Sequence, residues 1–459
     1  MGERPRTGQQ AERRALVADL IRTQAILQAR SEQLQEIFAS RWYRLARFAW
    51  RLRRGAVLRK AGPPRMAGEG SFAQPLDSAT AELDRREPAP GPPPPGLEAP
   101  RAGDQEPARQ GESGEAATRL LLAGHSLSFA AGLARRASNG GAVVREDRWQ
   151  THGAHSEEAS LAALAWADVV HCEWCLGNAV WYSRNKRPGQ RLVVRFHRME
   201  LDTDYPGEVD LAQVDAMVFV AGHVLERACE RWGWDPGDPR FEVIPNCVDP
   251  DPLQLPKLPG AQFCLAAIGY VPRLKRIDRA LDLLELLRRE NQRYCLVVKG
   301  REPWEHAWMA GRDDDRAYYE AISERLERTP SLRGAVSFEP FGDDVPAFLQ
   351  QAGWILSTSE VEGHSVALAE AMTSGAVPVV IERPGASEQY EERWVHGDAA
   401  AAAKAILATE ARGEAAAEGE AARRFAERWS WERLGPAWDE LLLTGRAGRP
   451  AGIAAQAQT

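Results

Sequence analysis

The chain has 459 residues, a formal net charge of −7, and 44% hydrophobic residues. This length is ample for a sizeable core and predicts about three domains, while the acidic balance argues against a nucleic-acid-binding protein. The absence of an apolar run long enough to span a bilayer argues against a transmembrane helix, and charges throughout the amino end argue against a signal peptide.

Residues 1–60 are predicted to form a helical arm. Leu20, Leu27 and Leu34 repeat every seven residues, which is compatible with a short coiled coil. Residues 41–60 combine an apolar face with a basic one, the pattern of a helix that lies on an anionic membrane surface. A helix that packs on the protein itself or on a partner would show the same pattern, so membrane contact and self-association through residues 10–60 both stay open. The basic residues are Arg41, Arg44, Arg47, Arg51, Arg53, Arg54, Arg59 and Lys60.

Residues 61–117 are predicted to be a disordered linker, because they are rich in Pro, Ala and Gly and contain little that could form a core. Residues 446–459 are predicted to be a flexible tail.

From residue 118 onward, short apolar runs alternate with helical patterns. This alternation predicts an α/β fold with parallel sheets covered by helices on both faces. Two sets of strands indicate two Rossmann-like domains, 118–253 and 254–445, that face a central ligand cleft. The predicted strands are Arg119–Ala123, Asp168–Cys172, Leu192–Phe196, Ala216–Val220 and Phe241–Ile244, then Phe263–Ile268, Cys295–Val298, Val336–Phe338, Trp354–Ser357 and Val377–Ile381.

The most informative stretch has two carboxylates eight positions apart, Glu362 and Glu370, between a predicted strand and a Gly stop at Gly375. We expect Glu362 at the entrance of a helix and Glu370 about two turns further in, so that both reach one ligand. On spacing alone, an ordinary βαβ unit with two surface glutamates explains the pattern equally well.

A basic loop follows the first strand of the second set. Arg273, Lys275 and Arg276 lie between a strand that ends at Gly269 and a helix that begins near Ile277. Cations at the amino end of a helix suit a diphosphate, although a solvated basic loop would look the same.

Two further patterns are better explained by structure than by chemistry. Cys172 and Cys175 form a single CxxC, CEWC, which has no second pair for a zinc site and is read as two small buried residues. Asp313, Asp314 and Asp315 precede a predicted helix and are read as a solvated cap region rather than a metal site.

At this point the residues resemble a family, the retaining glycosyltransferases of family 4 (group 1), which have the GT-B fold. The match covers roughly 118–443. It includes VIPNCVD at the domain joint, the loop Gly269 to Lys275, the strand RLVVRFHRM, and EGHSVALAEAMTSGAVPVV with its two glutamates. The amino-terminal segment SRWYRLARFAWRLRR also looks like the basic helix of bacterial surface-polysaccharide transferases.

The resemblance implies a role for each matched residue. Glu362 would contact the donor sugar, Glu370 would accept hydrogen bonds from the ribose hydroxyls, and Lys275 would neutralise the diphosphate. His197 would hydrogen-bond the sugar from the other domain. Backbone N–H groups would face the phosphates at Gly363, His364 and Ser365. The segment from Glu339 to Gly342 falls where the family places the base.

Departures from the family pattern concern the phosphates and the sugar. The family has Arg where this chain has Tyr270, and Arg273 is a candidate replacement. The glycine of the joint is Cys247, the opening loop of the first domain lacks the usual double glycine, and ERPGASEQYEERW replaces a glycine-rich segment.

The predicted function is transfer of a sugar from a nucleotide-diphosphate sugar to a hydroxyl, with retention, in cell-surface polysaccharide or glycolipid assembly. No metal or other cofactor is expected, and the partners are a nucleotide sugar and a carbohydrate or lipid-linked acceptor. The expected location is cytoplasmic, with the inner face of the membrane as one option. The alternatives are a non-catalytic nucleotide or carbohydrate binder and another GT-B enzyme, such as a sugar-nucleotide epimerase.

Overall fold

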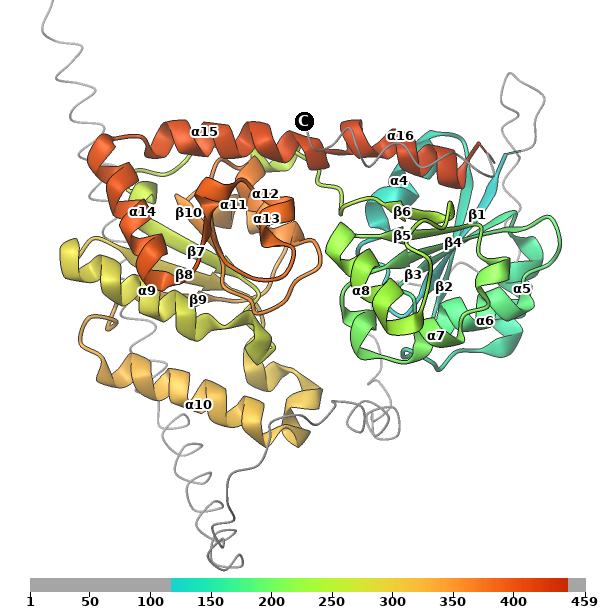
Figure 1. Cartoon of the computed structure of the whole chain (residues 1–459), viewed down its shortest axis with the longest axis horizontal. Helices are drawn as coiled ribbons and strands as arrows, with labels where there is room; N and C mark the ends of the chain where they lie inside the picture. Colours follow the sequence, from blue (N-terminus) through green and yellow to red (C-terminus); the bar gives the residue numbers. More distant parts are fainter. Residues whose placement is uncertain (1–116, 445–459) are drawn as a thin grey trace, which may run out of the picture. The chain divides into compact units, whose positions relative to one another are not determined.

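The computed structural model describes residues 117–444, which belong to one compact unit (Figure 1). They form two six-stranded parallel sheets, with strand orders β2-β1-β3-β4-β5-β6 and β12-β11-β10-β7-β8-β9. Each sheet carries helices, as expected for parallel sheets whose strands are buried on both faces. The predicted α/β fold with two Rossmann-like domains is therefore confirmed, whereas the predicted helical arm, linker and tail lie outside the described residues.

The first domain surrounds a core of short aliphatic strands. Leu120, Leu121 and Leu122 in β1 are essentially inaccessible to solvent. The strands are β1 (Arg119–Gly124), β2 (Val143–Arg148), β3 (Val169–Glu173), β4 (Arg191–Phe196), β5 (Ala216–Phe219) and β6 (Phe241–Val243); the helices are α4 (Ala131–Asn139), α5 (Glu157–Trp166), α6 (Gly177–Asn185), α7 (Tyr205–Glu208) and α8 (Gly222–Trp232).

The second domain repeats this arrangement with longer helices. Helix α9 buries Ile277, Leu281 and Leu284 on one face, which is the stripe expected of an amphipathic helix on a sheet. The strands are β7 (Cys264–Ile268), β8 (Cys295–Lys299), β9 (Val336–Glu339), β10 (Trp354–Ser357), β11 (Val377–Ile381) and β12 (Val395–His396); the helices are α9 (Ile277–Glu290), α10 (Asp313–Arg328), α11 (Val345–Leu349), α12 (Val366–Thr373), α13 (Ala386–Gln389), α14 (Ala399–Arg412), α15 (Ala415–Ala426) and α16 (Trp431–Leu442).

The last helix of the described chain packs on the first domain. In α16, Trp438 is buried against His171 of β3, and Asp439 forms an ion pair of 2.6 Å with Arg136 of α4. An isolated bridge between Val248 and Ser430 joins the segments that connect the domains. The chain therefore passes between the domains twice, once near Val248 and once near Ser430, and the two connecting segments are paired with each other.

All ten predicted strands are present, with ends that shift by one residue at most. Two strands were not predicted. Strand β2 has the sequence VVREDR and lies at an edge with most of its residues exposed, so it has no apolar run to reveal it. Strand β12 has two residues. Within residues 117–444, no helix is both long and apolar enough to cross a membrane.

Candidate functional site

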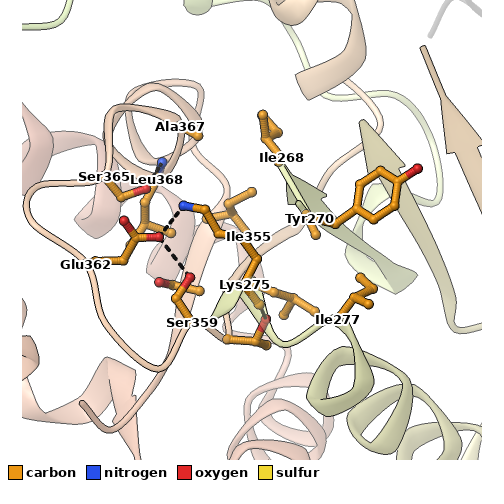
Figure 2. A pocket seen from close by; sticks show the side chains of 15 residues that line it. Ile268, Tyr270, Lys275, Ile277, Ile355, Ser359, Glu362, Ser365, Ala367 and Leu368 are labelled. Carbon is orange, nitrogen blue, oxygen red and sulfur yellow. Dashed lines mark hydrogen bonds and ion pairs between the residues drawn. The ribbon is translucent and has the colours of Figure 1, made fainter. Parts of the chain in front are cut away.

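A pocket lies where β7 and β10 of the second domain end. The turn after β7 contributes Gly269 and Tyr270, and the loop after β10 contributes Ser359 and Glu362 (Figure 2). Because the carboxyl ends of parallel strands meet at one edge of a sheet, two segments that are far apart in sequence build one site here.

Lys275 and Glu362 form the central ion pair of this pocket. The Lys275 ammonium donates a short hydrogen bond to Glu362 Oε1, and the Ser359 hydroxyl donates to the same oxygen at 2.8 Å (Figure 2). Burial raises the pKa of the Glu362 carboxyl, but Lys275, Ser359 and Arg383 more than offset that effect, and its pKa lies below the usual value. Glu362 is therefore ionised at neutral pH, and the structure brings the basic loop and the glutamate motif together in one pocket.

The helix after Glu362 begins later than the sequence indicated. Ser365 is the N-cap of α12, and its hydroxyl accepts a hydrogen bond from Leu368 N–H. The expectation that Glu362 stands at the helix entrance is therefore wrong, since it lies three residues earlier in a loop. Glu370 is the fifth helical residue, little more than one turn in and not two.

Glu370 differs from Glu362 in its electrostatics. Burial raises the pKa of the Glu370 carboxyl to about 7, and no other group contributes to this shift. The carboxylate is thus held in a poorly solvated place, and among residues 117–444 no cation balances its charge. A ligand that donates hydrogen bonds to such a carboxylate stabilises its ionised form strongly.

The loop that carries Glu362 is tied to the first domain through its backbone. The Glu362 carbonyl is hydrogen-bonded to His223 Nε2 at 2.8 Å, and the His364 carbonyl accepts from Asn246 Nδ2 at 2.9 Å. A Cβ placed on Gly363 would lie 3.1 Å from Arg198 Cβ, so only glycine fits this close approach comfortably. Asn246 of the predicted joint therefore connects the first domain to the loop of Glu362 in the second.

His197 lies next to this contact, at the carboxyl end of β4. Its Nε2 lies 2.6 Å from Glu173 Oε1, and Glu200 accepts a hydrogen bond from its backbone N–H at 2.8 Å. Burial raises the pKa of the fully buried Glu173, but Arg195 and the hydrogen bonds of His171 and His197 hold it well below the usual range. Glu173 thus fixes the imidazole through Nε2 and leaves Nδ1 for other partners.

Glu173 was missed in the sequence because CEWC was judged by its cysteines alone. Both cysteines are buried, as predicted. The signal that was available is a charged residue at the end of a strand that is otherwise apolar. Such a residue at the carboxyl edge of a parallel sheet is a candidate for the site.

Arg273 is placed differently from the other predicted ligands. It does not line the pocket; its guanidinium is half exposed and lies 3.5 Å from Asp315. Asp315 itself is buried and belongs to the first turn of α10, so the prediction of a solvated cap region is wrong for this aspartate. Tyr270, at the position where the resemblance leads us to expect an arginine, is buried and lines the pocket.

His364 and Arg383 are buried close to Glu362. Burial lowers the pKa of the His364 imidazole to about 3, so the ring is neutral, and both of its nitrogens lack hydrogen-bond partners among the described residues. The ring packs edge-on against Trp429, with 4.8 Å between the ring centroids. Arg383 belongs to the segment in which the sequence departs from the family.

The segment predicted to hold the base presents an exposed ring. Phe341 is 64% exposed, and the Arg301 guanidinium lies over it at 4.9 Å. Behind it, the buried Lys299 donates to the Pro340 carbonyl at 3.1 Å and pairs with Asp344 at 2.7 Å. An exposed aromatic face on a fixed turn suits a planar ligand.

One family model matches part of the chain. Residues 256–426 match the model of the family described as glycosyl transferases group 1. The matched segment contains Lys275, Glu362 and Glu370. No curated protein matches the chain.

Solved structures share the fold at low sequence identity. HepE of Anabaena, in complex with UDP-glucose, is 15% identical over 71% of this chain and 99% of its own, with a TM-score of 0.55. Sucrose-phosphate synthase of Thermosynechococcus elongatus is also 15% identical, over 71% of this chain and 98% of its own, with a TM-score of 0.55. TarM of S. aureus is matched over 60% of this chain with 15% identity and a TM-score of 0.46, and the chain spans 55% of TarM. The two structures with TM-scores of 0.55 show that the fold is the GT-B fold that the resemblance implied.

Proposed function

We propose that the chain is a retaining glycosyltransferase that moves a sugar from a nucleotide-diphosphate sugar to a hydroxyl acceptor. The observation that carries this proposal is the Lys275–Glu362 pair, formed by two loops at the carboxyl edge of the second sheet. The loop of Glu362 is also hydrogen-bonded to the first domain through its backbone carbonyls, at His223 and Asn246.

Each residue then has a task in the reaction. The bond between C1 of the sugar and the diphosphate oxygen breaks, and the electron pair leaves with the diphosphate, which Lys275 stabilises. The ionised Glu362 stabilises the positive charge that develops on the sugar ring. A bond forms between C1 and the acceptor oxygen on the same face, and the acceptor proton passes to the departing phosphate oxygen.

The nucleotide is held by groups outside the reacting centre. In this proposal Glu370 accepts hydrogen bonds from the two ribose hydroxyls, the N–H groups of residues 363–365 face the phosphates, and the Phe341 turn stacks on the base. Arg273 would have to leave Asp315 to reach the diphosphate.

The test is incubation of the purified protein with UDP-, GDP- and ADP-sugars and an extract of candidate acceptors. The expected result is acceptor-dependent release of free nucleoside diphosphate, together with a product whose linkage has the anomeric configuration of the donor. A chelator is expected to leave the rate unchanged, since Lys275 and the helix end carry the phosphate charge in this proposal. A product of inverted configuration would contradict the retaining mechanism.

A non-catalytic binder is the second candidate, and the replacement of an expected arginine by Tyr270 favours it. Such a protein would bind a sugar nucleotide without releasing nucleoside diphosphate. A sugar-nucleotide epimerase would instead convert one sugar nucleotide into another without transfer. The same incubation separates the three outcomes.

Residues 1–60 are proposed to hold the enzyme beside a lipid-linked acceptor in polysaccharide or glycolipid assembly, because residues 41–60 carry eight basic residues and no acidic one. Removal of residues 1–60 is expected to shift the protein from the membrane fraction to the supernatant. A variant with only residues 61–117 shortened is the control. Unchanged partitioning after removal of the arm would contradict membrane contact.

A further inference from the structure

The first domain carries aromatic side chains at the edge that adjoins the reacting loop. Trp174 follows β3 directly, and its ring centroid lies 4.2 Å from that of His197. Phe129 contacts both rings, at 5.6 Å from Trp174 and 4.9 Å from His197. Trp174 and Phe129 are only partly buried, so part of this aromatic cluster faces solvent beside the residue assigned to the donor sugar.

Trp174 is held in an unusual backbone conformation. Its φ is 74°, in the left-handed region that bulky side chains rarely adopt. The conformation is fixed on both sides, since the indole N–H donates to the Ser126 carbonyl at 2.9 Å and the next N–H, of Cys175, donates to Glu200 at 3.1 Å. Strained residues of this kind concentrate at ligand sites, where the strain places a side chain that ordinary geometry would not.

A second aromatic surface continues from the first. His125 contacts Trp174 at 5.7 Å and His152 at 4.6 Å, and His152 lies within the loop that borders an open pocket. This pocket encloses about 940 Å³, the solvent at its mouth included, between residues 149–155 and helices α6 and α7, which pack together (Figure 1). Its aromatic lining consists of Trp149, His155, Trp181 and Tyr205.

The pocket has both features that a sugar chain requires. His155 is stacked on Trp149 at 3.9 Å with an interplanar angle of 5°, and Trp181 meets His155 edge-on at 5.1 Å. Trp149 is fixed from behind, because its indole N–H donates to the buried Asp147 at 2.9 Å. Arg184 and Glu208, at the rim, offer donors and acceptors for hydroxyl groups. Trp149 is buried beneath His155, so the rings available to a ligand are the half-buried ones of His155 and Trp181. Such rings combined with polar groups at the rim match pyranose rings, whose faces are C–H and whose edges are hydroxyl.

We propose that Trp174 and this pocket form an extended binding site for an oligosaccharide acceptor, with Trp174 under the sugar that receives the transfer and the pocket around sugars further along the chain. The identification of this sugar chain as the acceptor rests on the proposed function. It goes further by assigning the acceptor to carbohydrate chains of more than one residue, since a single sugar at Trp174 would leave the pocket unused.

The test is saturation-transfer NMR on the full chain, with one- to four-residue oligomers of glucose, mannose and N-acetylglucosamine as probes. In at least one series, affinity is expected to rise with length. Trp174→Asn, in which asparagine tolerates the left-handed conformation, is expected to weaken binding of every length about tenfold or more. Trp181→Ala is expected to remove the gain with length and leave the single sugar unaffected. Trp304→Ala, an exposed tryptophan of the second domain, is the matched control.

Binding that does not depend on length, or that persists in both variants, would overturn the proposal, as would the absence of binding by every probe. Thermal unfolding of each variant verifies that it is folded. Nucleoside diphosphate binding is measured separately on the same samples. Nucleotide binding without oligosaccharide binding refutes this inference alone, whereas oligosaccharide binding without nucleotide binding refutes the proposed function and leaves a carbohydrate site.

Discussion

Replacement of Glu362 by Gln is expected to lower kcat by about 100-fold or more while the protein stays folded. The amide cannot balance the positive charge that develops on the sugar, and the loss of one preorganised electrostatic partner has an effect of about 2.7–4 kcal/mol on a transition state. The measurement is the steady-state rate of nucleoside diphosphate release with saturating donor and acceptor.

Glu360→Gln is the matched control for this variant. Glu360 lies two residues earlier in the same loop, but its partner is Arg276, at 2.5 Å, and its side chain is 41% exposed. Its replacement is expected to leave kcat within about twofold, since exposed ion pairs contribute about 0–1 kcal/mol. Transfer at the full rate by Glu362→Gln would show that Glu362 takes no part in the reaction.

Replacement of Glu370 by Gln is expected to stabilise the free protein and weaken nucleotide binding. The pKa of this carboxyl is about 7 in the folded protein, above the ordinary value of 4.5. The folded state therefore binds the proton more tightly, and stability is lost as the pH rises from 4.5 through 7. Glutamine lacks this charge, so the free energy of unfolding at pH 8 is expected to rise by up to about 3 kcal/mol, with no gain below pH 4.5.

The effect on binding has the opposite sign. A ribose diol donates to the ionised carboxylate, so wild-type affinity is expected to increase between pH 6 and pH 8, and the glutamine variant is expected to bind about tenfold less tightly and without that pH dependence. Chemical unfolding and calorimetric titration across this range measure both effects. Glu324→Gln, on the exposed face of α10, is the control. A variant that is less stable than wild type at pH 8 would show that Glu370 has a structural partner instead.

The parts of the candidate site that can be placed from the sequence are those whose spacing is local. Glu362 and Lys275 lie on short segments between a strand and a helix, and Glu370 lies in the helix that follows Glu362, so that order along the chain almost determines their positions in space. The position of Glu362 relative to α12 was wrong, because Ser365 competes as N-cap and its hydroxyl starts the helix three residues later.

Contacts between segments that are distant in the chain could not be predicted from the sequence. The pairing of Arg273 with Asp315 depends on how α10 packs, and the pKa values of Glu362 and Glu370 depend on burial that spacing does not express. The charge of Glu173 at the end of an apolar strand is visible in the sequence, but its contact with His197, 24 positions away, depends on the pairing of β3 with β4. Trp174 could not be identified because nothing in the sequence indicates that this tryptophan has a positive φ.

The most direct test of the nucleotide-sugar site is a thermal unfolding screen with UDP, GDP and ADP on the wild type and on Lys275→Ala. At 100 times its Kd, the correct nucleotide adds about 2.7 kcal/mol to the free energy of unfolding. We expect one nucleotide to raise the Tm of the wild type and of the surface control Lys404→Ala, and to have little effect on Lys275→Ala. No shift with any nucleotide, or an equal shift in Lys275→Ala, would contradict the assignment of this pocket to a nucleotide diphosphate.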